Sequence, residues 1–376
     1  MKKVLFGITG LTLGGAERVL VDISNALCHD YDITIFTLYA KGELETQLDE
    51  NVKIKSLYKK SYSELSKLSK IISSLRLLIL KKYIYKKYVK DDFDIEVAFL
   101  EGPITRLFSV KNSKTKKMVW IHNDISKVFG NGIKSVLKKL VDKNIYAKYN
   151  ELIFVSKDNL NKFEDTYKKL KYINKKVIYN YIDAKKVILK SNEDVKTEFD
   201  KNMINFVEVA RLVPQKAIDR IIKVHNRLVK EGFNNHRFYI IGDGPEKGKL
   251  TKMIKENKLE NSFVLLGKKE NPYPYMKEAD YFCLLSEFEG YGMVLEEAKI
   301  LNKAIIITDT AAREAVDNYK NKEIIGNSEK AIYEKIKEIL KERKIVNKIE
   351  NYDNKENLES LIELFEEVIN NENCKK

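Results

Sequence analysis

Apolar residues along this chain occur in two alternating patterns. Short, nearly continuous apolar runs, typical of strands buried on both faces, alternate with longer stretches whose apolar residues return every three or four positions, as in amphipathic helices. This alternation predicts an α/β fold with parallel, doubly wound sheets. The expected strands cover residues 4–8, 33–37, 52–57, 95–99, 118–121, 152–155 and 177–179, and then 204–210, 238–241, 263–266, 281–285 and 304–308.

The expected strands form two series, which predicts two domains. The first series lies in residues 1–183 and the second in residues 204–354, and the polar, charge-mixed stretch 184–203 is expected to link them. A length of 376 residues suffices for two separate cores. Residues 355–376 begin with an amphipathic helix, whose apolar positions are Leu358, Leu361, Ile362, Leu364, Phe365 and Val368.

The net charge of +14 is concentrated in the first half of the chain. Residues 1–203 contain 39 basic and 25 acidic side chains, whereas residues 204–376 contain 30 of each. Within 51–90, twelve basic residues accompany the single acid Glu64, and apolar residues recur at helical spacing at Leu65, Leu68, Ile72, Leu75 and Ile79. Such a helix either rests on an anionic lipid surface or packs on the sheet with a solvated lysine face.

Cysteine content and hydropathy indicate the compartment. Cys28, Cys283 and Cys374 have no metal-site spacing, and two of them lie in apolar patterns, so we expect reduced thiols and a cytoplasmic protein. The basic start of the chain runs at once into glycine-rich polar residues, unlike a signal peptide. No segment approaches the roughly 18 apolar residues of a membrane span. We therefore expect at most peripheral contact with the inner face of the membrane.

The stretch from Ser286 to Ala298 contains the strongest candidate site. It follows the expected strand 281–285, breaks regular structure at Gly290 and Gly292, and restores helical composition from Met293. Glycines allow close backbone approach, and the first N–H groups of a helix attract an anion, so this turn predicts a phosphate seat. Glu289 and Glu297 frame it; they are either acceptors for sugar hydroxyls or simply helix-favouring acids.

A second cationic loop follows the expected strand 204–210. Arg211 and Lys216 could together embrace a diphosphate, the guanidinium by forked hydrogen bonds and the ammonium as a point charge. In the first domain, Gly14 and Gly15 end a glycine-rich loop before a helix, an arrangement that suits a phosphate or a sugar. His122 follows the expected strand 118–121, where open α/β sheets place ligands.

The pattern Ser286-x-x-Glu289-Gly290-Tyr291-Gly292-x-x-x-x-Glu297-Ala298 resembles the donor-binding signature of family 4 of the retaining, nucleotide-sugar glycosyltransferases. The resemblance implies the GT-B fold, in which two Rossmann-like domains face each other across a cleft, and a final helix that crosses back to the first domain. It also implies roles for single residues. Arg211 and Lys216 would bind the diphosphate beside Gly290, Tyr291 and Gly292. Glu297 would bind the ribose, and Glu289 would bind the donor sugar. His122 and the loop of Gly14 and Gly15 would line the cleft on the side of the first domain.

Other motifs are weaker. The first glycine loop lacks G-x-G-x-x-G, which makes nicotinamide chemistry a poor alternative. Asp92-Phe93-Asp94 resembles the metal-binding Asp-x-Asp of GT-A enzymes, but it precedes a strand, and we interpret it as a loop. The chain departs from the resembled family at Asn302 and at Ala311-Ala312, so the identity of the donor is not inherited.

The resemblance implies a retaining, metal-independent hexosyltransferase that needs no cofactor. We expect a UDP-sugar donor and a glycan acceptor, with a lipid pyrophosphate-linked oligosaccharide of capsule or exopolysaccharide assembly as the working hypothesis. A sugar-nucleotide epimerase or a phosphorylase of the same fold is the alternative. A basic nucleic-acid-binding protein is a weaker one, because the chain has no binding-module motif and no array of stacking aromatics.

Overall fold

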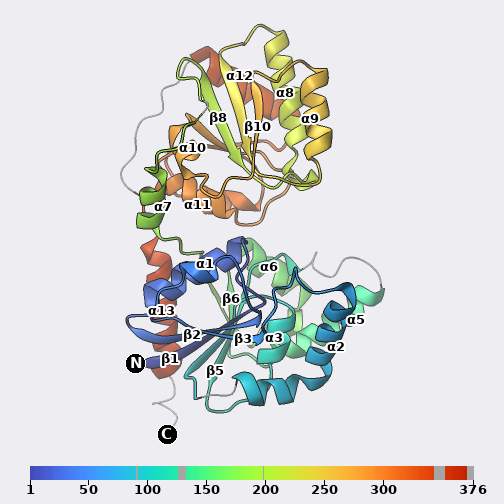
Figure 1. Cartoon of the computed structure of the whole chain (residues 1–376), viewed down its shortest axis with the longest axis vertical. Coiled ribbons are helices and arrows are strands. Elements are labelled where there is room, and N and C mark those ends of the chain that lie inside the picture. Colours follow the sequence, from blue (N-terminus) through green and yellow to red (C-terminus); the bar gives the residue numbers. More distant parts are fainter. Residues whose placement is uncertain (90–91, 126–132, 198, 343–351, 371–376) are drawn as a thin grey trace. The chain divides into compact units, whose positions relative to one another are not determined.

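The computed structural model describes residues 1–89, 92–125, 133–197, 199–342 and 352–370. The chain divides into two compact units (Figure 1): a first unit of residues 1–182 together with 355–376, and a second unit of residues 183–354. Each unit is built on one sheet, and every pairing between neighbouring strands in both sheets is parallel. The predicted α/β class with doubly wound parallel sheets is confirmed.

The sheet of the first unit has seven strands in the order β3-β2-β1-β4-β5-β6-β7. These are β1 (Lys2–Ile8), β2 (Tyr31–Tyr39), β3 (Lys53–Tyr58), β4 (Ile95–Ala98), β5 (Lys116–Ile121), β6 (Glu151–Phe154) and β7 (Asn174–Val177). The order in which successive strands are added reverses at β1, whose neighbours are β2 on one side and β4 on the other. This is the topological switch point at which open α/β sheets bind ligands.

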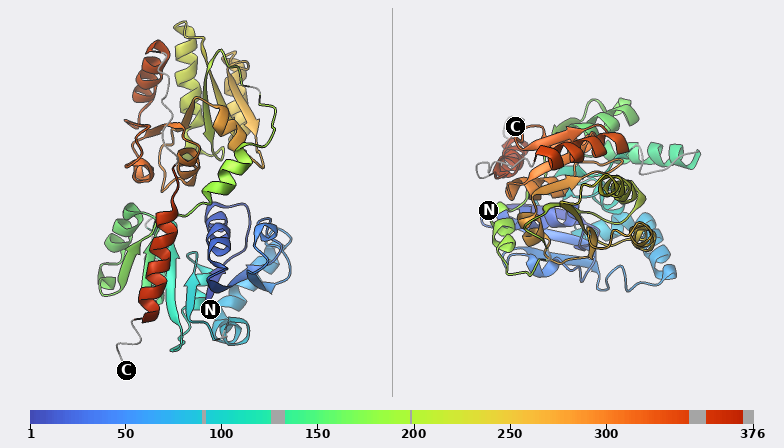
Figure 2. Two further views of the ribbon diagram at one scale, coloured as in Figure 1. Left: turned by 90° about the vertical axis from the view of Figure 1, so that its left-hand side faces the viewer. Right: turned by 90° about the horizontal axis from the view of Figure 1, so that it is seen from above.

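Helices cover both faces of this sheet. One face packs against α2 (Lys67–Ile84), α3 (Pro103–Phe108), α5 (Ile133–Tyr146) and α6 (Lys157–Thr166), whose apolar residues share a core with Leu5, Val119 and Phe154. The other face carries α1 (Gly15–Leu27) and α13 (Lys355–Asn370), which Figure 2 shows running along the strands of the first unit. Phe365 of α13 contacts the rings of Phe6 and Tyr31, with centroid distances of 6.3 and 5.8 Å. The last long helix is thus part of the first unit.

The sheet of the second unit has six strands in the order β10-β9-β8-β11-β12-β13. These are β8 (Ile204–Val209), β9 (His236–Ile241), β10 (Phe263–Gly267), β11 (Tyr281–Leu284), β12 (Ala304–Thr308) and β13 (Lys322–Ile325). One face buries a core under α8 (Ile218–Lys230), α9 (Lys247–Glu256) and α12 (Glu329–Glu342). The remaining helices are α7 (Ala184–Ser191), α10 (Tyr273–Glu278) and α11 (Met293–Ile300). The switch point lies between β8 and β11.

Most expected strands are present, with three differences. The strand expected at 177–179 ends at Val177, and β13 was not predicted because its lysine and glutamate break the apolar run. Residues 184–203, expected as a linker, include the helix α7. Asp92-Phe93-Asp94 forms a loop before β4, as predicted, and the Asp94 carboxylate accepts a hydrogen bond of 2.8 Å from the Lys3 amide at the amino edge of the sheet.

Candidate functional site

The carboxyl edge of the second sheet brings together two loops that are far apart in sequence. Strand β8 leads into residues 210–217 and β11 leads into residues 285–292, and the two strands are neighbours. Backbone and side-chain hydrogen bonds join the loops: the Glu287 amide donates to the Gln215 carbonyl at 2.9 Å, and Gln215 Nε2 donates to the Phe288 carbonyl at 3.0 Å. Both predicted groups of donor-binding residues in this unit therefore lie at one switch point.

The loop after β8 presents its two cations differently. Arg211 is exposed, and within the described part of the chain its guanidinium has no ion-pair partner. Lys216 ends a short 3-10 turn, Pro214–Lys216, and its ammonium is largely buried in an ion pair with Glu289. Gly242 and Gly244 lie directly against the backbone of this loop. A Cβ at Gly242 would lie 1.9 Å from the Ala210 carbonyl oxygen, and a Cβ at Gly244 would lie 2.4 Å from the Leu212 carbonyl oxygen.

Glu289 is held in place by Lys216 of the loop after β8 and by two residues of its own loop. Its Oε2 pairs with Lys216 Nζ and accepts a hydrogen bond of 3.5 Å from Ser286 Oγ, and its Oε1 accepts one of 3.3 Å from the Gly290 amide. Lys216 and Glu289 are 73 positions apart. The pair places a cation suited to phosphate directly beside a carboxylate suited to sugar hydroxyls.

The turn before α11 requires glycine at one position. Gly292 caps the helix with φ 71° in the left-handed region, where a side chain is strained. At Gly290, by contrast, a Cβ would meet no atom within 4 Å. Tyr291 is buried, and its hydroxyl donates to Glu296 at 2.7 Å. The predicted helix start at Met293 is confirmed, and α11 begins at the carboxyl edge of the sheet, where the loop after β8 also lies.

Glu297 is buried in α11, and its Oε1 accepts a hydrogen bond of 3.0 Å from the hydroxyl of Tyr273. Tyr273 is the first residue of α10, so α10 and α11 meet at the carboxylate that is the proposed ribose ligand. The neighbouring acid, Glu296, is structural, since it pairs with Lys299 Nζ at 2.8 Å and accepts from the Tyr352 hydroxyl at 2.8 Å. Of the two adjacent glutamates, only Glu297 stays a candidate for ligand binding.

A buried carboxyl beneath this site was missed from the sequence. Glu208 lies in β8 with no exposed surface; the Leu285 amide donates to its Oε2 at 3.3 Å, and its Oε1 has no partner in the described part of the chain. Burial raises its pKa from 4.5 to about 8, partly opposed by the positive charge of Lys216. The protonated form of Glu208 therefore predominates near neutral pH. The sequence did contain a signal for this buried carboxyl, namely an acidic residue within the otherwise apolar run 206–209.

In the first unit, the loop after β1 ends at Gly14, which caps α1 with φ −110°. A Cβ at Gly14 would lie 2.1 Å from Glu17 Oε2, so a carboxylate occupies the space beside the first turn of α1. Burial raises the pKa of Glu17, and hydrogen bonds to its own amide and to Thr12 oppose that shift. A carboxylate here repels phosphate and accepts hydrogen bonds from hydroxyls, so the loop of Gly14 and Gly15 suits a sugar better than a phosphate.

His122 follows β5 at the same edge of the first sheet. Its ring packs on Phe99 and Trp120, with centroid distances of 4.8 and 5.9 Å, and burial lowers its pKa to about 3. Among the described residues its Nε2 has no hydrogen-bond partner. Glu101, which follows β4, fixes the turn by accepting from the amides of His122 and Asn123 at 2.5 and 2.7 Å. The imidazole is therefore neutral and can bind a hydroxyl.

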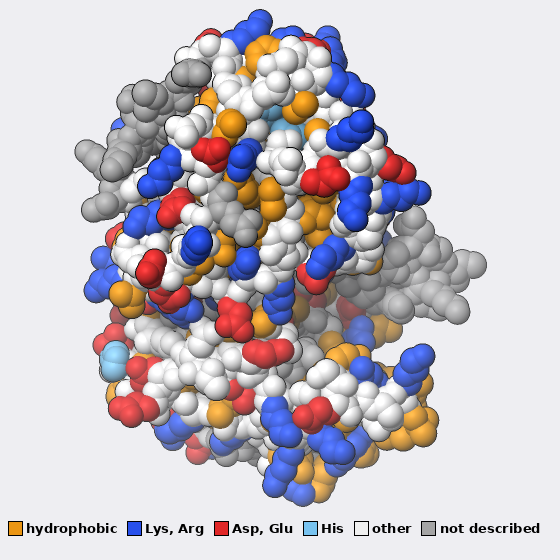
Figure 3. Space-filling view, turned by 45° about the horizontal axis from the view of Figure 1, so that its top comes forward, with side chains coloured by type: hydrophobic (Ala, Val, Ile, Leu, Met, Phe, Trp, Pro, Cys, Tyr) orange, Lys and Arg blue, Asp and Glu red, His pale blue; other side chains and the backbone are white. Residues whose placement is uncertain are grey.

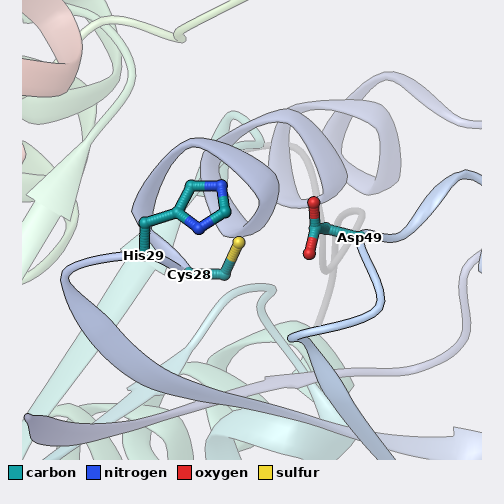
Figure 4. A group of neighbouring side chains, drawn as sticks. All are labelled: Cys28, His29 and Asp49. Carbon is teal, nitrogen blue, oxygen red and sulfur yellow. The ribbon is translucent and has the colours of Figure 1, made fainter.

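A third group of side chains, Cys28, His29 and Asp49, could offer one ligand atom each to a metal ion (Figure 4). Cys28 and His29 precede β2, and Asp49 precedes β3, so the group lies at the amino edge of the sheet. The Cys28 thiol donates to the Asn25 carbonyl at 3.2 Å, and burial raises its pKa. This group lies at the opposite edge from the loops that follow β1, β4 and β5. Cys28 and Cys283 are free, and Cys374 lies outside the described residues.

The structure groups the predicted site residues by unit. It brings Arg211, Lys216, Glu289, Gly290 and Gly292 to the switch point of the second sheet, with Tyr291 and Glu297 in the adjoining helix turn. It places Gly14, Gly15 and His122 at the carboxyl edge of the first sheet. Their roles in binding stay predictions.

Comparisons with known proteins show which proteins this chain resembles. Residues 190–373 match the family model of glycosyl transferases group 1. An uncharacterized glycosyltransferase, MJ1059, of Methanocaldococcus jannaschii is 31% identical over 211 residues, which cover 55% of this chain and 51% of that protein. The chain thus spans about half the length of this relative.

A second relative matches over nearly the full length of both chains. The N-acetylgalactosamine-N,N'-diacetylbacillosaminyl-diphospho-undecaprenol 4-alpha-N-acetylgalactosaminyltransferase of Campylobacter jejuni is 28% identical over 354 residues, 92% of each chain. Other relatives are named as glycosyltransferases of amylovoran and O-antigen biosynthesis.

Solved structures of glycosyltransferases share the fold. The crystal structure of Anabaena Alr3699/HepE in complex with UDP and glucose superposes with a TM-score of 0.73 at 16% identity, covering 98% of this chain and all of that one. The chain therefore has the GT-B fold, and over residues 190–373 it is similar to the glycosyl transferases group 1. The relatives that it resembles are named as glycosyltransferases, two of them of polysaccharide biosynthesis.

Proposed function

We propose that this protein is a retaining glycosyltransferase that moves a hexosyl unit from a nucleoside diphosphate sugar, most simply a UDP-sugar, to a hydroxyl of a growing glycan. The observation that carries the proposal is the meeting of Arg211, Lys216 and the first turn of α11 at the switch point of the second sheet. Two side-chain cations and a helix N-terminus provide the charge that a leaving diphosphate requires.

In the proposed reaction, the bond between the sugar C1 and the diphosphate oxygen breaks, and a bond between C1 and the acceptor oxygen forms on the same face. The acceptor proton passes to an oxygen of the leaving phosphate, so no protein nucleophile takes part. Arg211, Lys216 and the amides near Gly292 stabilise the developing charge. Glu289 positions the donor sugar's hydroxyls, Glu297 the ribose, and neutral His122 a further hydroxyl. Stabilisation by these groups needs no metal ion or cofactor.

For the acceptor, we propose a lipid pyrophosphate-linked oligosaccharide at the inner face of the membrane. The Campylobacter relative is named for a diphospho-undecaprenol acceptor, and the positive charge of the first half of this chain suits an anionic one. Among the described residues, none of the helices combines the length and the apolarity needed to cross a bilayer. The acceptor would then be met at the membrane surface.

A thermal-stability panel of nucleotides and nucleotide sugars tests the donor site. A ligand at about a hundred times its Kd should raise the melting temperature by roughly 5 to 10 °C. The rise should be lost in Lys216→Ala and Glu297→Ala, and kept in Lys252→Ala, a matched control whose side chain on α9 is 75% exposed. The absence of a shift with every nucleotide would refute the proposal.

Product analysis then distinguishes the reaction classes. With a UDP-sugar and acceptor glycan, we expect a product whose anomeric configuration by NMR equals that of the donor. Isomerisation of the donor without acceptor would instead identify an epimerase, and a requirement for inorganic phosphate would identify a phosphorylase.

A further inference from the structure

Helix α2 exposes a continuous apolar face. Six large side chains on it are between 50% and 74% exposed: Leu68, Ile71, Ile72, Leu75, Leu78 and Ile79. Their spacing of three and four positions puts all six on one side of the helix, which we call the outer face of α2. A contiguous exposed apolar patch of this kind marks an interaction surface.

The orientation of the helix is fixed by its opposite side. Ser73, Leu77 and Ile84 are buried there, and Ser73 Oγ shares a hydrogen bond of 2.9 Å with the hydroxyl of Tyr39. Directly after the helix, buried Tyr85 donates to Glu96 of β4 at 2.5 Å. A rotation that buried the outer face would break these contacts. The outer face is thus presented outward by the packing of the first unit.

The stripe predicted at positions 65, 68, 72, 75 and 79 therefore does not pack on the sheet. Four of its members, Leu68, Ile72, Leu75 and Ile79, lie on the outer face, and only Leu65 packs against the core. The helix does pack on the core of the first unit, as the second alternative expected, but not through this stripe. The contact with the core is made by a narrower buried row of α2 that contains Leu77 and Ile84.

Positive charge borders the outer face. The helix contains Lys67, Lys70, Arg76, Lys81 and Lys82 and no acidic residue. At its carboxyl end a hollow of about 490 Å³ is lined by Lys81, Lys82, Lys111, Lys116 and Lys148, and by Lys117, whose ammonium is paired with buried Glu96. Figure 3 shows basic and apolar side chains gathered at the lower right of the molecule, where Figure 1 places α2.

We infer that the outer face of α2 docks on an anionic lipid bilayer, with its leucines and isoleucines among the acyl chains and its lysines and the lysine-lined hollow at the phosphate headgroups. Apolar residues bordered by cations match the two layers of such a surface. A second copy of this chain would bring like charges together, which opposes association. The inference rests on the proposed function only in so far as a lipid-linked acceptor requires the enzyme at a membrane.

Vesicle sedimentation of the full chain tests the inference. Wild type should bind phosphatidylglycerol-containing vesicles, bind phosphatidylcholine vesicles far less, and release as salt rises. Each buried leucine or isoleucine changes partitioning by roughly tenfold or more, so Leu75→Asp with Ile79→Asp should weaken binding at least about 100-fold. Arg76→Gln with Lys82→Gln should weaken it roughly 30-fold and flatten the salt dependence.

The matched control is Leu189→Asp, because Leu189 is 73% exposed on α7 of the second unit. It should bind vesicles like wild type. Equal binding by wild type and the Leu75→Asp, Ile79→Asp variant would overturn the inference, as would wild type that ignores vesicles but forms a dimer which this variant dissociates. All substituted side chains are exposed, so circular dichroism melts should match. Nucleotide stabilisation is measured without vesicles, so failure of the donor site and failure of docking are separable.

Discussion

Replacing Glu208 by glutamine should make the stability of the second unit less dependent on pH. Glu208 has no exposed surface, and its pKa rises from 4.5 to about 8, chiefly because burial penalises the charged carboxylate. Glutamine has the shape of the protonated acid and cannot ionise. Wild type and Glu208→Gln should therefore be similar near pH 4.5 and should diverge as the pH rises.

The sign and size of this pH effect on the free energy of unfolding follow from proton linkage. Between pH 4.5 and about 8 the folded state keeps a proton on Glu208 that the unfolded state has released, so the free energy of unfolding falls as pH rises. The slope is at most about 1.4 kcal/mol per pH unit. From pH 5 to pH 8, wild type should lose roughly 3 to 4 kcal/mol relative to the variant, because the slope is below its maximum near each pKa, and the difference should then level off.

Urea unfolding followed by far-UV circular dichroism at several pH values measures this difference. The single tryptophan, Trp120, is buried in β5, so its fluorescence follows the first unit and provides an internal reference. Glu260→Gln is the matched control, because Glu260 is exposed after α9. Parallel stability curves for wild type and Glu208→Gln from pH 5 to pH 8 would show that Glu208 is charged throughout and would refute the reasoning.

Two further predictions concern the site itself. Gly292→Ala should destabilise the second unit by about 1 to 2 kcal/mol in thermal or urea unfolding, because residue 292 has φ 71° and a Cβ there would lie 3.1 Å from Leu284 Cδ2. Gly290→Ala is the control and should destabilise it little, since a Cβ at residue 290 would meet no atom within 4 Å. Equal losses in the two variants would contradict this. His122→Gln should lower transfer activity about tenfold without adding or removing a step near pH 6.5 in the rate profile, because the pKa of His122 is about 3 and the imidazole is already neutral.

The parts of the fold that could be predicted are those with a local signal. Continuous apolar runs located eleven of the expected strands closely, and the pair of glycines located the start of α11 at Met293. Asn302 adopts φ 52°, the left-handed conformation expected where asparagine replaces glycine. The strand β13 lies at the edge of its sheet and has only partly buried residues before Ile325, so its sequence lacks an apolar run.

The parts that could not be predicted depend on contacts between distant residues. Lys216 and Glu289 are each ordinary in sequence, and their pairing arises only because β8 and β11 are neighbours. Tyr273 and Glu297 are likewise 24 positions apart. Glu208 was overlooked because an acid in a strand ordinarily points to solvent, and only burial on both faces of this sheet makes it neutral.

The neutral state of Glu208 also bears on donor binding. While it is protonated, Glu289 is the carboxylate that pairs with Lys216, and in the proposed donor site the positive charge of Arg211 is left for the diphosphate. Above pH 8, ionised Glu208 adds a second negative charge near Lys216, which opposes an anionic donor.

For the same reason, the sequence could not predict which side of α2 faces the sheet. Helical spacing of apolar residues shows that one side of a helix is apolar, but an identical spacing serves a side that packs on a sheet and a side that faces outward. The direction was decided by Ser73, Leu77 and Tyr85, whose contacts with Tyr39, the core and Glu96 turn the leucine-rich side away from the sheet. Packing among the described residues of the unit leaves this side uncovered while lysines border it, and the anionic bilayer that we propose as its partner supplies both the apolar layer and the opposite charge.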